Sequence, residues 1–394
     1  MVDEAKILDV VSISGENVKK FDGERSYLST GNLDFNKISN LEIVTYENKP
    51  SRANQTVNIG EVIFAKMKDT KKTLVINKTN KNIIVSTGFY VLKPSKEILP
   101  QYLYHYLNSS YFLNQKNRLS KGATQSALNN EGLANIKIRM YNLKVQEKVV
   151  RVLDKAQELI DKRKEQIEVL DELVKSRFIE MFGTPSKNEK NWEISEIGKY
   201  LDVLTDYHSN GSYETLRDNV TLLDTKGYAL MVRTTDLENN NFEKGVKYID
   251  EHAYNYLEKS KVFGGEVIIN KIGSAGKVYL MPFLKKPVSL AMNQFMLRFN
   301  EDKVNHIFLY NLLLTSYMES KIKEKVRGAV TKTITKDAVR KINIIVPPIR
   351  LQNQFANFVK QVNSLKFEME TSLKELEDNF NSLMQKAFKG ELFN

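Results

Sequence analysis

The segment GEVIFAK at residues 60–66 returns as GEVIINK at residues 265–271, and this recurrence decides how the chain is organised. Sliding the sequence along itself by 205 or 206 residues brings further pairs into register in the same order. They are Lys72 with Lys277, Tyr102–Tyr104 with Phe308–Tyr310, Gly122-Ala123 with Gly328-Ala329, Leu128 with Ile334, Ile136-x-Ile138 with Ile342-x-Ile344, Gln146 with Gln352, and Phe182 with Phe388. So many ordered matches at nearly one offset indicate a tandem duplication of a long structural unit.

The two copies differ most between Tyr207 and Lys261, where the second copy is longer and has little similarity to the first. A lead-in that contains the only tryptophan, Trp192, also precedes the second copy alone. If the matched parts form a shared scaffold, the divergent parts are where the two copies would recognise different things.

Each copy ends in a segment whose apolar residues recur every three or four positions, which predicts a long helix with a heptad seam. In the first copy the helix is expected at residues 146–182, and its seam residues are Val149, Leu153, Ala156, Ile160, Ile167, Leu170, Val174 and Met181. In the second copy the helix follows Pro347-Pro348, and its seam residues are Phe355, Val359, Val362, Met369, Leu373, Leu376, Phe380, Leu383 and Ala387. Nearly forty residues correspond to about 55 Å at the α-helical rise.

The narrow seam and the neutral, charge-rich faces around it favour packing of one helix on the other. Packing of each helix on its own domain is the alternative. Two basic residues, Arg163 and Lys366, occupy seam positions, where they would either set the register or point outwards.

The part of each copy that precedes the helix predicts a mixed domain. Runs of β-branched and aromatic residues predict strands at residues 61–64, 73–76, 82–86 and 89–92 in the first copy, and at 266–270, 278–281 and 294–299 in the second. A helix is expected next, at 101–114 or 306–323, and then a last strand at 136–140 or 342–346. The fold class is therefore expected to be α+β, a mixed domain and a long helix repeated in tandem.

Composition limits the class of protein. The 394 residues are 41% hydrophobic and 27% charged, which is typical of a globular chain with two or more domains. The absence of cysteine excludes disulfides, thiolate zinc sites and cysteine nucleophiles. Because neither a long apolar run nor a signal-peptide pattern is present, we expect a cytoplasmic protein with no membrane partner.

The net charge of +11 is unevenly distributed. Residues 1–142 hold 20 Lys and Arg against 13 Asp and Glu, and residues 184–346 hold 24 against 20. The two helical segments, residues 143–183 and 347–394, are neutral, with 9 and 6 residues of each sign. A polyanion that binds both mixed domains is the simplest physical reason, and charge that serves only solubility is the alternative.

A turn with the sequence KIGSAGK at residues 271–277 joins two predicted strands. It is not a Walker A loop, because its glycines are too close together and Val278 stands where a Ser or Thr would hold magnesium. Lys271 and Lys277, with their counterparts Lys66 and Lys72, are candidate contacts to DNA phosphates. A plain hairpin with solvated lysines is the alternative.

The loops before the last strands combine cations with amide and hydroxyl groups, which can bond to phosphates and to base edges. Basic residues at a helix end also complement the helix dipole, and that structural role is the alternative. The candidate DNA-binding residues in these loops are Lys116, Arg118, Lys121, Thr124, Gln125, Lys323, Lys325, Arg327, Thr331 and Lys332.

The sequence carries no recognisable catalytic motif. Its four histidines lack metal-ligand spacing, and neither a nucleophile elbow, a dinucleotide-binding glycine pattern nor a paired-carboxylate nuclease signature is present. Pro347-Pro348 is followed by Ile349, so the Pro-Pro-aromatic motif of amino-methyltransferases is missing. We therefore expect no catalytic residue, no metal site and no cofactor.

The order of these features resembles the specificity subunits of type I restriction-modification systems. The resemblance covers the whole chain, and the features that carry it are the two GEV segments, the Gly-Ala loops before Ile-x-Ile, ValProPro before Gln352, and AlaPheLysGlyGluLeu at residues 387–392. One departure is Tyr141-Asn142, which stands where the second copy and the family have Pro-Pro.

The resemblance implies a non-catalytic subunit that binds double-stranded DNA through two target-recognition domains, residues 1–142 and 184–346, each reading one half of a split site. The spacer helices, within residues 143–183 and 347–394, would pair antiparallel as a coiled coil. They would dock two modification subunits, adenine methyltransferases that carry S-adenosylmethionine, and restriction nuclease-translocase subunits would join that complex.

Three other interpretations remain open. The chain could be the recognition subunit of a related system whose partner fuses methyltransferase and nuclease. It could be a self-sufficient DNA methyltransferase or nuclease with an unfamiliar motif, or a coiled-coil scaffold with no DNA role.

Overall fold

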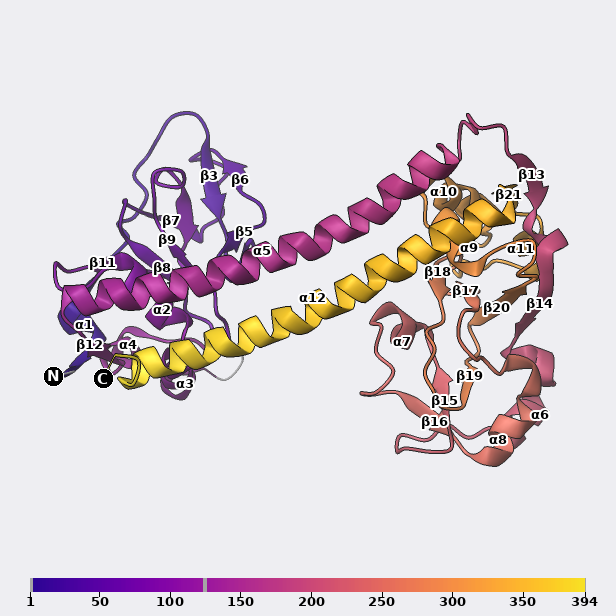
Figure 1. The fold of residues 1–394 in the computed structure, drawn as a ribbon. Coiled ribbons are helices and arrows are strands. Elements are labelled where there is room, and N and C mark those ends of the chain that lie inside the picture. Colours follow the sequence, from indigo (N-terminus) through magenta and orange to yellow (C-terminus); the bar gives the residue numbers. More distant parts are fainter. Residues whose placement is uncertain (1–2, 123–125, 394) are drawn as a thin grey trace. The chain divides into compact units, whose positions relative to one another are not determined.

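The computed structural model describes residues 3–122 and 126–393 (Figure 1). The chain forms two compact units: unit 1 comprises Met1–Gln166 with Met369–Asn394, and unit 2 comprises Ile167–Glu368. Each unit therefore combines one mixed domain with part of the first long helix and part of the second.

In the described part of unit 1, one antiparallel sheet has the strand order β2-β11-β8-β9, a second sheet has the order β6-β3-β10-β7, and β1 pairs with β12. The strands are β1 (Asp3–Lys6), β2 (Val11–Ser14), β3 (Arg25–Leu28), β4 (Leu33–Asp34), β5 (Lys37–Ile38), β6 (Glu42–Val44), β7 (Ala53–Thr56), β8 (Val62–Ala65), β9 (Thr73–Val75), β10 (Ile84–Ser86), β11 (Phe89–Pro94) and β12 (Lys137–Met140). The short helices are α1 (Ile7–Val10), α2 (Pro100–Asn108), α3 (Ser110–Leu119) and α4 (Asn130–Ala134).

In unit 2 the corresponding sheet has the order β14-β20-β17-β18, a second sheet has the order β16-β15-β19, and β13 pairs with β21. The strands are β13 (Glu193–Glu196), β14 (Leu201–Asp206), β15 (Ala229–Val232), β16 (Lys247–Ile249), β17 (Val267–Asn270), β18 (Val278–Leu280), β19 (Val288–Leu290), β20 (Gln294–Phe299) and β21 (Asn343–Val346). The short α-helices are α6 (Tyr213–Asn219), α7 (Thr234–Glu238), α8 (Glu251–Tyr256), α9 (His306–Leu313), α10 (Ser316–Lys325) and α11 (Lys336–Arg340).

The duplication is confirmed by the equivalent sheets β2-β11-β8-β9 and β14-β20-β17-β18. Each GEV segment leads into an inner strand, β8 or β17, in which all four residues are buried. A strand that is covered on both faces is mostly apolar, which is why Val62–Ala65 and Val267–Ile269 are unbroken hydrophobic runs. The one polar residue, the buried Asn270 at the end of β17, is hydrogen-bonded to Thr234 and Tyr279.

The helical stretches expected at residues 101–114 and 306–323 are confirmed, but each is divided into two helices. In unit 1 the chain breaks at Ser109, whose hydroxyl accepts a hydrogen bond from the Phe112 N–H at 3.1 Å and starts α3. In unit 2 Thr315 starts α10 in the same way, by accepting from the Met318 N–H. A serine or threonine can cap a new helix within a run that otherwise has helical periodicity.

The two long helices are α5 (Leu143–Phe182) and α12 (Ile349–Lys389). In unit 1, Val149 and Leu153 near the start of α5 share a buried core with Met384, Ala387 and Phe388 near the end of α12. The helices therefore run antiparallel to each other in this unit, as the resemblance implied.

Unit 2 contains the opposite ends of the same helices. Phe178 and Phe182 of α5 lie against Phe355 of α12, with ring centroids 5.4 and 5.5 Å apart. Phe308 of α9 stacks on Phe178 at 5.8 Å, which joins the helix pair to the mixed domain. Burying each of these rings contributes about 2 kcal/mol or more of hydrophobic free energy, so helices and domain form one core.

A buried glutamine anchors the start of each long helix to its own domain. Gln146 accepts a hydrogen bond from the Leu99 N–H at 2.9 Å and donates to the carbonyls of Glu97 and Tyr141. Gln352 makes the equivalent bonds to Asn305, Lys303 and Pro347. Both side chains are fully buried, and the bonds satisfy amide groups that would otherwise be costly to bury.

The two basic seam residues differ in their contacts. Within unit 2, Lys366 of α12 forms an ion pair with Asp171 of α5 at 2.7 Å. Arg163 instead donates a hydrogen bond to Gln166 on its own helix. At the start of α5, the side chain of Asn142 accepts a hydrogen bond from the Val145 N–H. This cap replaces the Pro-Pro that precedes α12. In the described residues no helix is long and apolar enough to span a membrane.

Candidate nucleic-acid interface

In unit 1 the fold brings together the two loops that carry predicted binding residues. The chain beyond β8 pairs with the loop that leads to α4, because Met67 bridges to Ala127 and the Leu128 N–H donates to the Lys66 carbonyl at 2.9 Å. Lys121 also bridges to Ala127. These backbone bonds hold the two loops side by side, although the bonded residues are about sixty positions apart in sequence.

Unit 2 repeats the arrangement. Ile272, beyond β17, bridges to Thr333, and the Ile334 N–H donates to the Lys271 carbonyl at 3.1 Å. Arg327 also bridges to Thr333. The glycine turn and the loop between α10 and α11 thus form one surface, which we call the paired loops. In unit 2 the paired loops are residues 271–277 with 325–334, and in unit 1 they are residues 66–72 with 121–122 and 126–128.

A lysine at the base of each pair of loops lies over an aromatic ring. The ammonium of Lys66 is 4.4 Å from the centroid of Tyr90, and that of Lys271 is 5.6 Å from Phe295, the residue that corresponds to Tyr90. Burial lowers the pKa of Lys66 from its ordinary value. The lysines are therefore held in equivalent places by the duplicated scaffold.

Unit 2 adds a buried carboxylate at this point. Asp206, at the end of β14, accepts from Lys271 at 2.9 Å and from Lys336 at 2.8 Å, and it also accepts from the Ser209 hydroxyl. Its side chain is only 7% exposed. Burial by itself would raise the pKa of Asp206, but the hydrogen bonds from Lys336, Ser209 and Lys271 outweigh it and lower the pKa to about 2.

Unit 1 has no counterpart of this carboxylate. In unit 2 the strand register pairs Asp206 with Phe295, which corresponds to Tyr90 in unit 1. In unit 1 Ser14 pairs with Val91, so the residue opposite Tyr90, and therefore the counterpart of Asp206, is Gly15. Lys66 consequently keeps an ammonium charge that no acid balances within the described residues of unit 1.

We expect Asp206→Asn to lower the free energy of unfolding of unit 2 by about 2 kcal/mol near pH 6, at 1.36 kcal/mol per unit of pKa shift. The folded-state pKa lies below the unfolded-state pKa, so this contribution is present above about pH 4 and is lost as the pH falls towards 2. The difference between the wild type and the variant should therefore shrink to roughly half at pH 3.

Urea unfolding followed by the fluorescence of Trp192 measures this difference, because the only tryptophan packs on the core of unit 2. Asp337→Asn is a matched control in the same unit, since its side chain is 83% exposed. It should change stability by less than about 0.5 kcal/mol. If the difference in unfolding free energy between the wild type and Asp206→Asn stayed constant from pH 6 to pH 3, the role given to Asp206 would be contradicted.

The structure contradicts the assignment of Lys116 to the DNA-binding residues. Its side chain is fully buried, and its ammonium donates to the carbonyls of Ala65 and Thr70 and to the Thr70 hydroxyl. Burial lowers the pKa of Lys116 to about 8. The three donors of this group are used to hold α3 against the end of β8, so none is left for a phosphate.

The other predicted residues fall into two groups. Lys72, Lys121, Lys271 and Lys277 lie at the paired loops but already have protein partners, which are the Thr30 carbonyl, Glu131, Asp206 and Glu238. Exposed or half-exposed groups without an acidic partner among the described residues are Arg118, Lys323, Lys325, Arg327, Thr331 and Lys332. Thr124 and Gln125 lie outside the described residues.

Sequence reasoning missed Asp206, His208 and Lys336 in unit 2. His208 Nδ1 lies 3.3 Å from the Lys271 ammonium, and burial together with that charge lowers the pKa of His208. The divergence of the segment from Tyr207 onwards pointed to this region, but no local pattern links residues that are 65 and 130 positions apart. Within the described ranges no cluster of His, Asp and Glu could hold a metal ion.

A family model described as the type I restriction modification DNA specificity domain matches residues 2–170 and 189–378. The chain belongs to this family. It is thus a type I specificity subunit with two recognition domains, one in each matched segment. Each match contains one set of paired loops, so the candidate surface is part of the family's own domain in both copies.

Individual relatives of the specificity subunit are distant in sequence. A putative type I restriction enzyme MjaX specificity subunit from Methanocaldococcus jannaschii is 23% identical over 358 residues, which are 86% of this chain and 79% of the relative. A chain solved in a study of assembly and conformational transition of the type I R-M system is 18% identical, with a TM-score of 0.62 over 99% of this chain and 98% of that one. The type I S subunit from M. genitalium is 14% identical, with a TM-score of 0.56 over 98% and 96%. The solved structures support the fold.

Proposed function

We propose that this specificity subunit has no catalytic activity of its own and reads a split double-stranded DNA site, one half with each unit. The observation that carries the proposal is the repetition of the paired loops, which join predicted DNA-binding residues in both copies. The recognition domains are then residues 1–142 and 184–346, and each would position its loops on one half-site.

The charges on these loops support a phosphate-binding role. Among the predicted binding residues of unit 2, the cations without an acidic partner in the described structure lie on one stretch of chain, from Lys323 to Lys332, next to the glycine turn. Cations that are not yet neutralised release the most counterions when they meet phosphates, and this supplies affinity that does not depend on sequence. Amide and hydroxyl groups nearby would add base contacts.

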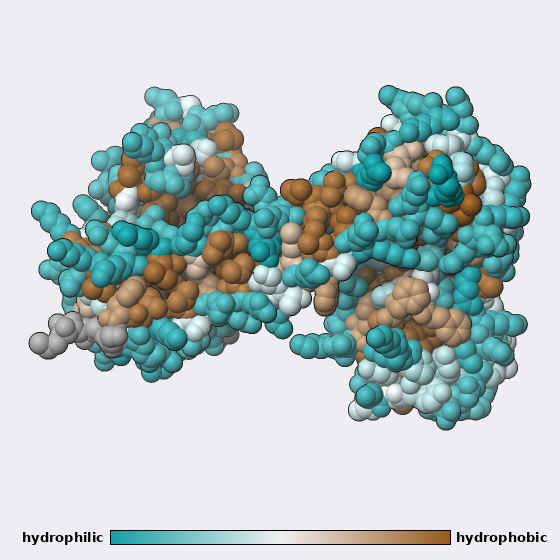
Figure 2. All heavy atoms as spheres, viewed as in Figure 1, coloured by the Kyte–Doolittle hydropathy of each residue, from teal (hydrophilic) through white to brown (hydrophobic). Residues whose placement is uncertain are grey.

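The long helices would dock the partners that the family uses, two adenine methyltransferase subunits, and restriction nuclease-translocase subunits would join them. In unit 2, Val169, Leu173 and Ile179 of α5 remain 43–58% exposed, outside the buried seam. Figure 2 shows apolar patches among the mostly hydrophilic side chains of the visible face of each unit. Exposed apolar groups rimmed by charges are typical of protein interfaces.

Incubating the purified chain with DNA and radiolabelled S-adenosylmethionine separates this proposal from a self-sufficient methyltransferase. We expect no incorporation with the chain alone and incorporation once a modification subunit is added. Incorporation or cleavage without any partner would contradict a non-catalytic subunit. A partner that supplies both methylation and cleavage in one chain would identify the related fused system instead.

Salt dependence tests the surface itself. We expect the triple change of Lys323, Lys325 and Lys332 to Gln to weaken binding to all DNA sequences. It should also flatten the plot of log affinity against log salt concentration by up to about 0.9 per lost phosphate contact. Binding would be measured by fluorescence anisotropy in the assembled methyltransferase complex.

Changing Lys226, Lys244 and Lys285 to Gln is the matched control, because these lysines are also exposed and removing them lowers the net charge by the same amount. They lie in loops that lead to β15, β16 and β19, away from the paired loops in the chain. An equal loss of slope in both variants would mean that only net charge matters and that the paired loops are not the contact surface.

A further inference from the structure

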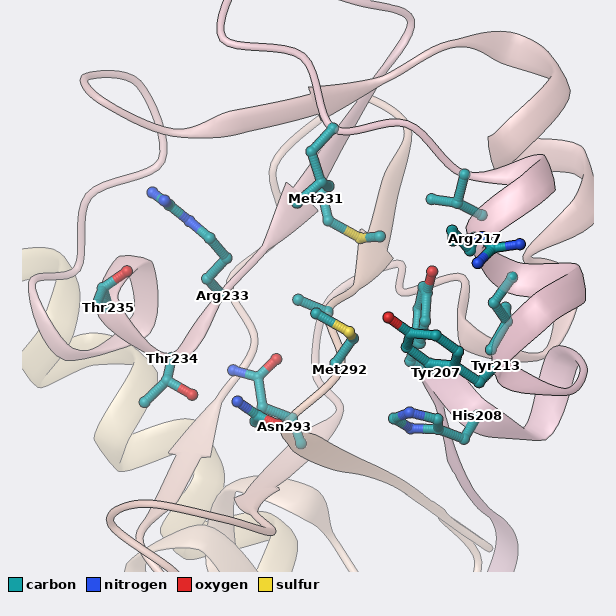
Figure 3. A pocket seen from close by; sticks show the side chains of 15 residues that line it. Tyr207, His208, Tyr213, Arg217, Met231, Arg233, Thr234, Thr235, Met292 and Asn293 are labelled. Carbon is teal, nitrogen blue, oxygen red and sulfur yellow. The ribbon is translucent and has the colours of Figure 1, made fainter.

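A pocket of about 490 Å³ lies in unit 2 beside the paired loops. Figure 3 shows Met231 and Met292 pointing towards the rings of Tyr207 and Tyr213 across an open space. Tyr207 and Met231 are buried, whereas Tyr213 is 72% exposed and Met292 is 45% exposed. The pocket therefore has a closed apolar floor and an accessible aromatic rim, and its volume is within the range of about 300–1,000 Å³ that small-molecule sites occupy.

Polar groups that have no hydrogen-bond partner among the described residues line the same space. They include the Tyr207 hydroxyl, the Asn293 side-chain amide and the Thr235 hydroxyl. By contrast, Gln294 is committed to the fold, because its amide is placed to donate to the Val232 carbonyl and accept from the Thr234 N–H. Apolar and aromatic walls with a few free donors and acceptors suit a flat, uncharged heterocycle.

The pocket adjoins the proposed DNA-binding surface through direct bonds. The Lys271 N–H donates to the carbonyl of Asn293 at 2.7 Å, and His208, which lines the pocket, lies 3.3 Å from the Lys271 ammonium. Tyr207, Tyr213, Met231 and Arg233 all come from the segment that has little similarity to the first copy. A ligand in this pocket would therefore affect one half-site only.

We propose that this pocket receives one nucleobase that has left the base stack of the DNA bound at the paired loops of unit 2. The inference rests on the proposed DNA-reading function. Enzymes that extrude a base hold it between aromatic and apolar side chains and bond its pairing edge, and the rings, methionines and free amide here are the same kinds of group. Asparagine amides can form paired bonds to adenine.

The charges favour a base from DNA over a free nucleotide. A free nucleotide would bring its own phosphate and need a cation inside the pocket that is still available. Both arginines in the lining are already paired, Arg233 with Asp236 at 2.7 Å and Arg217 with Asp218 at 3.3 Å. The predicted DNA-binding cations that have no acidic partner among the described residues, Lys323 to Lys332, lie at the neighbouring loop instead, where a DNA backbone would lie.

The test compares duplexes in which each base pair of the half-site of unit 2 is replaced in turn by a mismatch. Binding is measured with the full chain in its methyltransferase complex. A mismatched base costs less to extrude, by up to a few kcal/mol, so we expect binding to become about 10-fold tighter or more at one position. At other positions a mismatch should only weaken binding.

Two variants test whether the tighter binding of the mismatched duplex depends on the pocket. Met292→Trp fills the open space and should abolish the gain, whereas Leu314→Trp, which is 41% exposed and outside the pocket, should keep it. Tyr213→Ala removes an exposed stacking ring and should weaken binding of the favourable mismatch about 5- to 150-fold, which corresponds to about 1–3 kcal/mol per stacked base.

A gain that survives Met292→Trp would arise from base extrusion by the partner and would overturn the pocket's role. If adenosine or thymidine monophosphate bound the pocket without DNA, and no mismatch strengthened DNA binding, the ligand would be a free nucleotide and not a base from DNA. If the fully paired duplex bound tightly but no mismatch strengthened binding, this inference would be refuted and the proposed function would stand. Failure to bind the paired duplex would count against the proposed function itself.

Discussion

Exchanging residues 184–346 for the corresponding domain of a relative is expected to change the bases recognised in one half of the DNA site and leave the other half unchanged. The physical reason is that the cores of the two units contain separate sets of side chains. DNA-binding proteins typically bind their specific site about 10³- to 10⁷-fold more tightly than other DNA. Replacing one recognition domain should therefore move that preference to a new half-site sequence.

The exchanged domain must keep its packing on the helix pair. Phe308 of α9 stacks on Phe178 and contacts Phe182 in a T-shaped arrangement, and both of these α5 residues stay behind in the exchange. Replacing a buried phenylalanine by a small residue costs about 3–5 kcal/mol, so a donor with an aromatic residue at position 308 is required. Otherwise unit 2 would be destabilised rather than redirected.

Methylation mapping of random DNA by the assembled complex measures the outcome. The reciprocal exchange of residues 1–142 is the control and should alter only the other half-site. If either exchange changed both halves, the two units would not read DNA independently, and the modular function would be refuted.

Lengthening both long helices by one heptad is expected to change the distance between the half-sites. Insertions after Ile167 and after Leu373 preserve the seam and add about 10 Å to each helix, or about three base pairs at 3.4 Å per step. The insertion points fall between residues that already pair across the helices: Lys164 bonds to Glu377 at 2.8 Å and Lys366 to Asp171 at 2.7 Å. Both contacts would be kept.

The preferred gap between half-sites should grow by about three base pairs, with unchanged bases in each half. Because about 10.5 base pairs make one turn of DNA, this step also rotates the second half-site by roughly a third of a turn, and binding can be lost altogether. Three added heptads restore the phase, since they add about 31 Å, or about nine base pairs. Selection of binding sites from DNA libraries with variable gaps measures the result.

A lengthened chain that folds and binds with full affinity at the original gap would show that the helices do not set the distance. Circular dichroism of the variant distinguishes this outcome from simple misfolding, because two intact added heptads increase the helical signal. Forty or forty-one residues per helix correspond to a helix length of about 60 Å.

The sequence by itself determined the duplication, the α+β class and the two long helices. These features depend on short-range sequence patterns. Seam residues such as Val149 and Leu153 recur with the helical period, and a fully buried strand such as β8 is apolar throughout. Of the second sheets, β6-β3-β10-β7 and β16-β15-β19, the sequence predicted only the strand at residues 82–86, because the other strands are three or four residues long and give little periodic signal. It also missed the helix breaks at Ser109 and Thr315, where a capping hydroxyl outweighs the apolar period.

Only the tertiary structure decided which cations are available for a nucleic acid. Lys116 and Arg118 look alike in the sequence, but β8 and its following loop cover Lys116 and leave Arg118 exposed. Asp206 neutralises lysines that are 65 and 130 positions away, while Gly15 leaves Lys66 without such a partner. The free energy of a charge depends on its solvent exposure and on partners brought close by folding, and neither is a property of the neighbouring sequence.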